Sequence, residues 1–68
     1  MSEAQTTGEV LEEILARELA AKTFYEDLCE EVQGTEFERF LPELEHMAEE
    51  EAEHVEEVRE LLAKYGDD

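Results

Sequence analysis

A single break, Gln33-Gly34-Thr35, separates two long stretches in which apolar residues recur with the spacing of an α-helix. The first stretch predicts a helix over about residues 8–32, and the second predicts a helix over about residues 36–65. Two helices joined by so short a turn favour an antiparallel hairpin, so the expected fold is all-α. Residues 1–7 and 66–68 are expected to be tails.

The starts of both helices carry a recognisable pattern. Thr6 with Glu9, and Thr35 with Glu38, have the spacing of a capping box, in which each side chain bonds to the backbone N–H of the other residue. Pro42 interrupts the second stretch, because proline has no N–H to donate inside a helix. It predicts either a short helical turn that restarts at this point or a kink in a continuous helix.

Three polar residues fall on the apolar faces of these helices. Glu18 is the one acid of the first helix that points inward, and Glu51 and His54 lie on the apolar face of the second. A second Glu-x-x-His string, Glu43 to His46, falls on the polar side and is interpreted as surface. In the assembled protein we expect exposure of His46 and Glu13 and burial of four residues of the apolar faces: Leu15, Leu19, Leu44 and Val55.

Charge limits the classes of partner. The chain of 68 residues has 22 acids against 5 bases and a formal net charge of −17. This charge argues against nucleic acid and anionic membrane surfaces as partners and favours cations. No apolar run approaches the roughly 20 residues of a membrane span. A single cysteine, Cys29, and the lack of a secretion signal predict a reducing, cytoplasmic location.

Inward carboxylates in a short chain predict both a partner and a metal. A lone hairpin of 68 residues buries little apolar surface, so we expect a homodimer or higher homo-oligomer in a four-helix bundle. An ionised carboxylate in an apolar seam costs several kcal/mol unless a cation or donors compensate it. Two chains would offer four Glu and two His, the ligand set of di-iron carboxylate bundles. Mn²⁺ or Zn²⁺ could take the same ligands.

The residues Glu18 within ARELAAKTFY, and Glu51 and His54 within MAEEEAEHVEEV, resemble the rubrerythrin and ferritin-like superfamily. The chain is similar to half of a rubrerythrin bundle or to a short encapsulated ferritin, over about Glu9 to Tyr65. The resemblance implies that Glu18 is a terminal iron ligand, that Glu51 bridges two irons and that His54 is a terminal nitrogen ligand. It also implies that Tyr25 hydrogen-bonds to a ligand glutamate.

The chain departs from these families at several points. Rubrerythrins carry a further carboxylate where this chain has Ala21, and they usually have a four-cysteine rubredoxin domain, whereas this chain has only Cys29. Encapsulated ferritins rely on a protein shell, which makes such a shell a further expected partner. Their shell-targeting tail has no counterpart after Tyr65.

Two functions are predicted. The first is a ferroxidase, in which a di-iron centre between two subunits oxidises Fe(II) to Fe(III) with O₂ or peroxide, for iron storage or detoxification. The alternative is a non-catalytic acidic helical dimer that acts as a scaffold or interaction module, with Glu18 and Glu51 hydrated at splayed edges. Metal content would separate the two.

Overall fold

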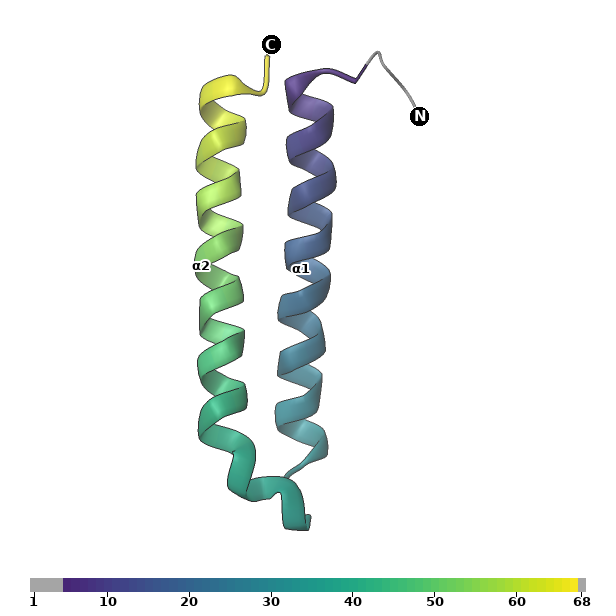
Figure 1. Cartoon of the computed structure of the whole chain (residues 1–68), viewed down its shortest axis with the longest axis vertical. Helices are drawn as coiled ribbons and strands as arrows, with labels where there is room; N and C mark the ends of the chain where they lie inside the picture. Colours follow the sequence, from purple (N-terminus) through teal and green to yellow (C-terminus); the bar gives the residue numbers. More distant parts are fainter. Residues whose placement is uncertain (1–4, 68) are drawn as a thin grey trace.

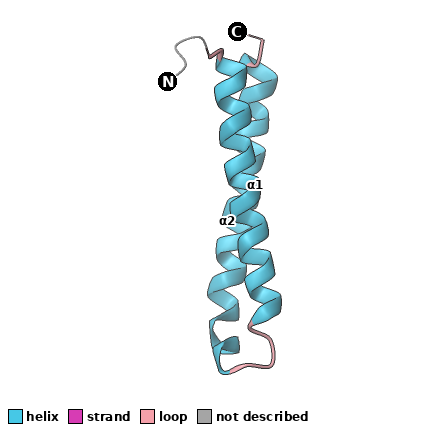
Figure 2. Ribbon diagram, turned by 90° about the vertical axis from the view of Figure 1, so that its right-hand side faces the viewer, coloured by secondary structure: helices cyan, strands magenta, loops and turns pink. Residues whose placement is uncertain are grey.

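The computed structural model describes residues 5–67, and this part of the chain contains helices and turns without a strand. The elements are α1 (Thr7–Glu31), a short 3₁₀ helix η1 (Glu36–Phe40) and α2 (Leu41–Tyr65). α1 and α2 lie side by side and antiparallel (Figure 1), and they overlap when the molecule is turned by 90° (Figure 2). The start of α1 and the end of α2 therefore share one end of the molecule. The predicted all-helical hairpin is confirmed.

The first helix begins as its sequence pattern predicts, one residue earlier than expected. The Thr6 N–H donates to Glu9 Oε1 at 2.9 Å, and the Glu9 N–H donates to Thr6 Oγ1 at 3.1 Å. Both halves of the capping box are present. Two N–H groups that the helix leaves without partners are therefore satisfied at its start.

The second helix begins differently from the prediction. Gly34 takes a left-handed conformation, with φ of 78°, and its N–H donates to the Glu38 carboxylate at 3.1 Å. Thr35 Oγ1 accepts from the Phe37 N–H at 3.1 Å, so Thr35 caps η1 and the reciprocal box expected between Thr35 and Glu38 does not form. The tighter 3₁₀ turn explains this, because it brings the Phe37 N–H within reach of the threonine.

Pro42 lies in the first turn of α2, where the missing N–H costs no hydrogen bond. The structure therefore has the first of the two predicted arrangements, a short helical turn followed by a restart. The α-helix begins at Leu41, and residues 36–40, expected to be α-helical, form η1 instead.

The two helices meet along one row of residues on each, here called the seam, whose members are spaced alternately by three and four positions. All of its members are buried or half-buried. The seam residues of α1 and its C-cap are Gly8, Leu11, Leu15, Glu18, Lys22, Tyr25, Cys29 and Val32. Those of α2 are Leu41, Leu44, Ala48, Glu51, Val55, Val58 and Leu62.

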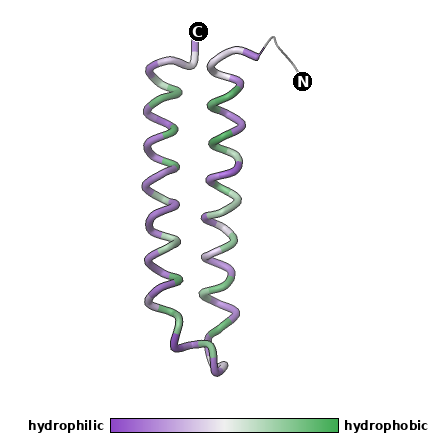
Figure 3. The backbone as a smooth tube through the Cα atoms, viewed as in Figure 1, coloured by the Kyte–Doolittle hydropathy of each residue, from purple (hydrophilic) through white to green (hydrophobic). Residues whose placement is uncertain are grey.

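The hairpin alone buries little of its apolar surface. Val55, Val58 and Leu11 are the most deeply buried large residues, with exposed fractions of 3%, 8% and 9%. Apolar segments recur along both helices (Figure 3), and several large side chains on them remain exposed. Leu19, expected in the core of the assembled protein, is one of these; it directly follows seam residue Glu18 and so lies beside the seam. Within residues 5–67, neither helix contains an apolar stretch long enough to cross a membrane.

At the end away from the turn, the two backbones come into direct contact. A Cβ atom on Gly8 would lie 2.4 Å from the Gly66 carbonyl oxygen, closer than real Cβ atoms approach. Glycine at position 8 therefore lets the first turn of α1 pack against the residue that ends α2.

Candidate metal centre

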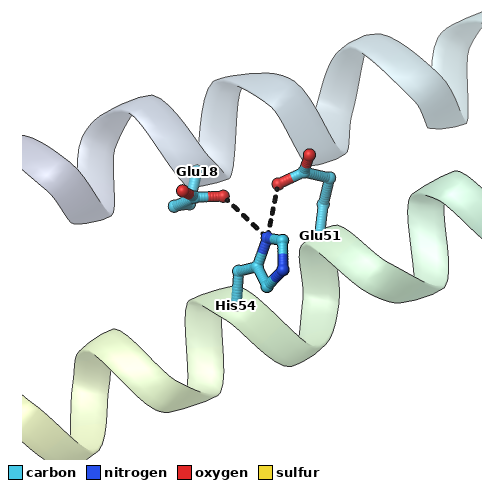
Figure 4. Close-up of side chains that lie close together, drawn as sticks. All are labelled: Glu18, Glu51 and His54. Atoms are coloured by element: carbon cyan, nitrogen blue, oxygen red, sulfur yellow. Dashed lines mark ion pairs between the residues drawn. The ribbon is translucent and has the colours of Figure 1, made fainter.

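The three polar residues predicted from the sequence come together at mid-length of the hairpin. Glu18 projects from α1 and Glu51 and His54 project from α2, one turn apart (Figure 4). One ligand atom from each residue lies within 4.8 Å of those of the other two. Because Glu18 and Glu51 are seam residues, the packing of the helices brings the carboxylates together.

His54 lies between the two carboxylates. Its Nδ1 atom is 3.3 Å from Glu18 Oε1 and 3.4 Å from Glu51 Oε1. Both distances exceed the usual 2.9–3.0 Å of an N–H···O hydrogen bond. Both carboxylates therefore contact His54 Nδ1 as ion pairs that are longer than ordinary hydrogen bonds.

One oxygen of this trio has no partner. Glu51 Oε1 is buried and accepts no hydrogen bond among the described residues. An ionised oxygen in that position has lost water, and its nearest donor, His54 Nδ1 at 3.4 Å, replaces that water only weakly, which is unfavourable. A cation held between the three side chains would supply what this oxygen lacks.

The exposure of the three side chains increases from one side of the site to the other. Glu51 is 19% exposed, Glu18 29% and His54 50%. The site is thus closed behind Glu51 by the seam and open beside His54.

The proximity of the two acids shifts protonation. The pKa of Glu51 lies above its ordinary value, first because a proton on Glu51 can be shared with Glu18, then because of desolvation and the negative charge of Glu18. Desolvation lowers the pKa of His54, but hydrogen bonding to Glu51 and Glu18 and their negative charges outweigh it, so the pKa of His54 is raised. Without a metal, Glu51 and His54 therefore hold their protons more tightly than the separate residues would.

The donor set and its dimensions fit a divalent metal. Carboxylate oxygens and an imidazole nitrogen bind such ions at about 2.0–2.2 Å, which places neighbouring ligand atoms about 3 Å apart. The two separations that involve His54 Nδ1, 3.3 and 3.4 Å, are close to this value, and the ligand atoms of all three residues lie within 4.8 Å of one another. One chain supplies three ligand residues, and the open side at His54 leaves room for more.

The other Glu-x-x-His string is placed where the sequence predicts. The His46 side chain is 68% exposed and forms an ion pair with Glu50 at 3.4 Å. With Pro42, Glu43, Met47 and Glu50 it lines a shallow hollow formed by α2. No residue of α1 lines this hollow, so the string lacks the third ligand that Glu18 gives the inner one.

Three other seam residues of α1 form no contact with the site among the described hydrogen bonds and ion pairs. Tyr25 is a half-buried seam residue whose ring meets Phe24 edge to face at 5.4 Å, and among residues 5–67 it makes no hydrogen bond to Glu18 or Glu51. Lys22 pairs with Glu26 at 2.7 Å instead of with the site. Burial, followed by the charges of Glu45 and Glu26, raises the pKa of Cys29 and keeps the thiol protonated.

No family model, curated protein or solved structure matches this chain. The resemblance to ferritin-like proteins therefore stays a prediction that rests on the site residues and their spacing.

Proposed function

We propose that two copies of this chain assemble into a four-helix bundle that binds a pair of iron ions and oxidises Fe(II) to Fe(III). The observation that carries this proposal is the convergence of Glu18, Glu51 and His54 around a buried carboxylate oxygen without a partner. Carboxylates and imidazole together are the ligands of di-iron bundles.

The need for a second copy follows from ligand number. Three residues leave most of the coordination sphere of an iron ion unfilled, and the half-exposed His54 leaves the site open on one side. A twofold axis beside His54 would add a second set of the same residues. Four carboxylates and two imidazoles would then hold two ions.

Iron is the substrate in this proposal. Each of two Fe(II) ions loses one electron, and O₂ takes up both electrons with two protons to give hydrogen peroxide; with peroxide as oxidant, the products are two waters. Glu51, the most buried ligand, would lie between the ions, as the resemblance implies, with Glu18 and His54 at the sides. Storage of the ferric product in a surrounding protein shell, in the cytoplasm, completes the proposal.

The alternative is an acidic helical dimer that needs no metal. One observation favours it: His54 with a raised pKa can carry a positive charge between Glu18 and Glu51 and so neutralise part of their charge. In that case the trio would be a structural ion-pair cluster, and the protein would act as a scaffold or interaction module.

The experiment compares two matched double variants of α2. Glu51→Ala with His54→Ala removes the inner string, and Glu43→Ala with His46→Ala removes the outer one, with the same loss of charge and the same helix. Iron content after anaerobic Fe²⁺ loading and gel filtration, and ferric absorbance after exposure to air, are measured for each.

We expect about two irons per dimer and oxidation faster than in buffer for the unmodified chain and the outer variant. The inner variant should lose most of both. Absence of bound iron in the unmodified chain would favour the scaffold, and equal losses in the two variants would remove the assigned ligands.

A further inference from the structure

Building on the proposed function, we infer which surface receives the second copy: the side of the seam formed by Ile14, Ala21 and Leu28 with Phe40, Met47, His54 and Leu61. This surface is called the open flank. The occupant is a second copy of the same chain, docked by its own open flank.

The geometry of the seam defines two flanks. Some neighbouring seam members are four positions apart, such as Leu11 and Leu15. The residue after the first of them, Glu12, and the residue before the second, Ile14, point to opposite sides of the seam. In an antiparallel pair, the residues in the position of Ile14 lie on the same side of the seam in both helices, and they form the open flank. Those that follow seam members lie on the other side, called the charged flank: Glu12, Leu19, Glu26, Glu45, Ala52 and Arg59.

The open flank contains no charged residue apart from the titratable His54, in a chain of which 40% is charged. Four of its apolar side chains are exposed in the single chain: Ile14 at 38%, Met47 at 41%, Leu61 at 42% and Phe40 at 44%. Both helices therefore present exposed apolar side chains on this flank, a grouping of the kind that marks interaction surfaces. The charged flank has four charged members and only one large apolar side chain, Leu19.

Charge selects the flank on which a second copy can dock. Two copies with a formal charge of −17 each repel one another over most of their surfaces. The flank that bears no carboxylate is the side on which two such chains approach with the least repulsion. Beyond it, the acids Glu43, Glu50 and Glu57 of α2 form a polar rim of the kind that surrounds protein interfaces.

The candidate metal centre opens on the same flank. His54 belongs to the open flank, and Glu18 and Glu51 are the seam members nearest to it, whereas Lys22 lies toward the charged flank and pairs there with Glu26. Ala21, one turn after Glu18, presents only a methyl group on the open flank. A copy docked on this flank brings its own trio toward the first, and a copy docked on the charged flank cannot.

Two leucine-sized residues of α1 make a matched test. Ile14 lies on the open flank and Leu19 on the charged flank, and each is 38% exposed. Ile14→Glu and Leu19→Glu therefore add the same charge to the same helix at the same exposure. Leu61→Glu tests the open flank from α2. Dimer dissociation constants are measured by analytical ultracentrifugation with anaerobic Fe²⁺, and far-UV circular dichroism verifies helix content.

We expect Ile14→Glu and Leu61→Glu each to weaken the dimer at least about 100-fold, because each interface would bury two unpaired carboxylates. Leu19→Glu should change it less than about threefold. A dimer weakened by Leu19→Glu but not by the other two would overturn the open flank while leaving iron binding and oxidation intact. An unmodified chain that stays monomeric at every concentration would overturn it as well. An unmodified dimer without iron defeats the proposed function alone.

Discussion

Two segments of α2, Glu43–His46 and Glu51–His54, have the same residue types at the same spacing on one helix. They differ in where the helix places them: Glu51 is a seam residue, 19% exposed and close to Glu18, whereas His46 is 68% exposed and forms its ion pair with Glu50 of the same helix. The comparison teaches that the spacing of Glu and His three residues apart ensures only that the two side chains lie on neighbouring turns of one helix. The register of the second helix decides whether a third ligand joins them.

The largest expected difference between the two segments is their response to metal. Anaerobic Fe²⁺ should raise the melting temperature of the unmodified chain and of His46→Ala, since a ligand that binds only the folded assembly stabilises it by about 4 kcal/mol at a thousand times its dissociation constant. His54→Ala should lose most of this rise. Differential scanning calorimetry with and without Fe²⁺ measures it, and a full rise in His54→Ala would break the comparison.

A smaller effect is expected from replacing the third ligand without metal. Glu18→Leu should raise the stability of the metal-free protein by about 1 kcal/mol, because an apolar side chain in the seam no longer loses hydration or repels Glu51. Glu43→Leu, on the outer segment, should change it by less than about 0.5 kcal/mol. Urea unfolding of the three proteins gives the values. Destabilisation by Glu18→Leu would mean that the contacts of Glu18 stabilise the metal-free protein by more than its desolvation and its repulsion of Glu51 cost.

The smallest expected effect is on the pH dependence of the metal-free protein. The pKa values of Glu51 and His54 are both raised. The folded state therefore binds more protons than the unfolded state at pH values from the ordinary carboxyl pKa of 4.5 to beyond the ordinary imidazole pKa of 6.5. Stability is therefore greatest at the acidic side of this range and falls as pH rises through the raised values.

Thermal melting between pH 4.5 and 8 in a His46→Gln background, which leaves His54 as the only histidine, measures this dependence. Adding His54→Gln should flatten the part of the profile near neutral pH. A profile that rises with pH in the parent variant would contradict the direction of both shifts. Metal binding should show the opposite trend, because the ion competes with protons for the same ligands.

Much of the fold follows from local patterns that the sequence displays. The apolar periodicity predicted both helices and the positions of Glu18, Glu51 and His54, because a helix places residues three and four apart on one face regardless of its surroundings. The Thr6 capping box also needs only neighbouring residues, and it forms as predicted. His46 is exposed, as the same periodicity predicts.

The features that sequence patterns missed depend on more than one segment. The box at Thr35 does not form because the path of the turn brings other donors to both side chains: the Phe37 N–H donates to Thr35 Oγ1, and the Gly34 N–H donates to the Glu38 carboxylate. The burial of Leu19 in the assembled protein stays a prediction; in the single chain Leu19 lies beside the seam, because the angle at which α2 packs decides which residues enter it. The contact of Gly8 with Gly66 joins residues at opposite ends of the chain, which no local pattern can relate.

That contact between Gly8 and Gly66 also determines how anything attached to the hairpin would be arranged. Any chain that extends from the start of α1 or from the end of α2 leaves the molecule at the same end. The turn in which Phe37 stacks on Phe40 lies at the opposite end. Two fused labels would therefore crowd one another while the turn stays accessible. A surface or a pair of fluorescent labels attached through the two termini would therefore lie at one end of the hairpin.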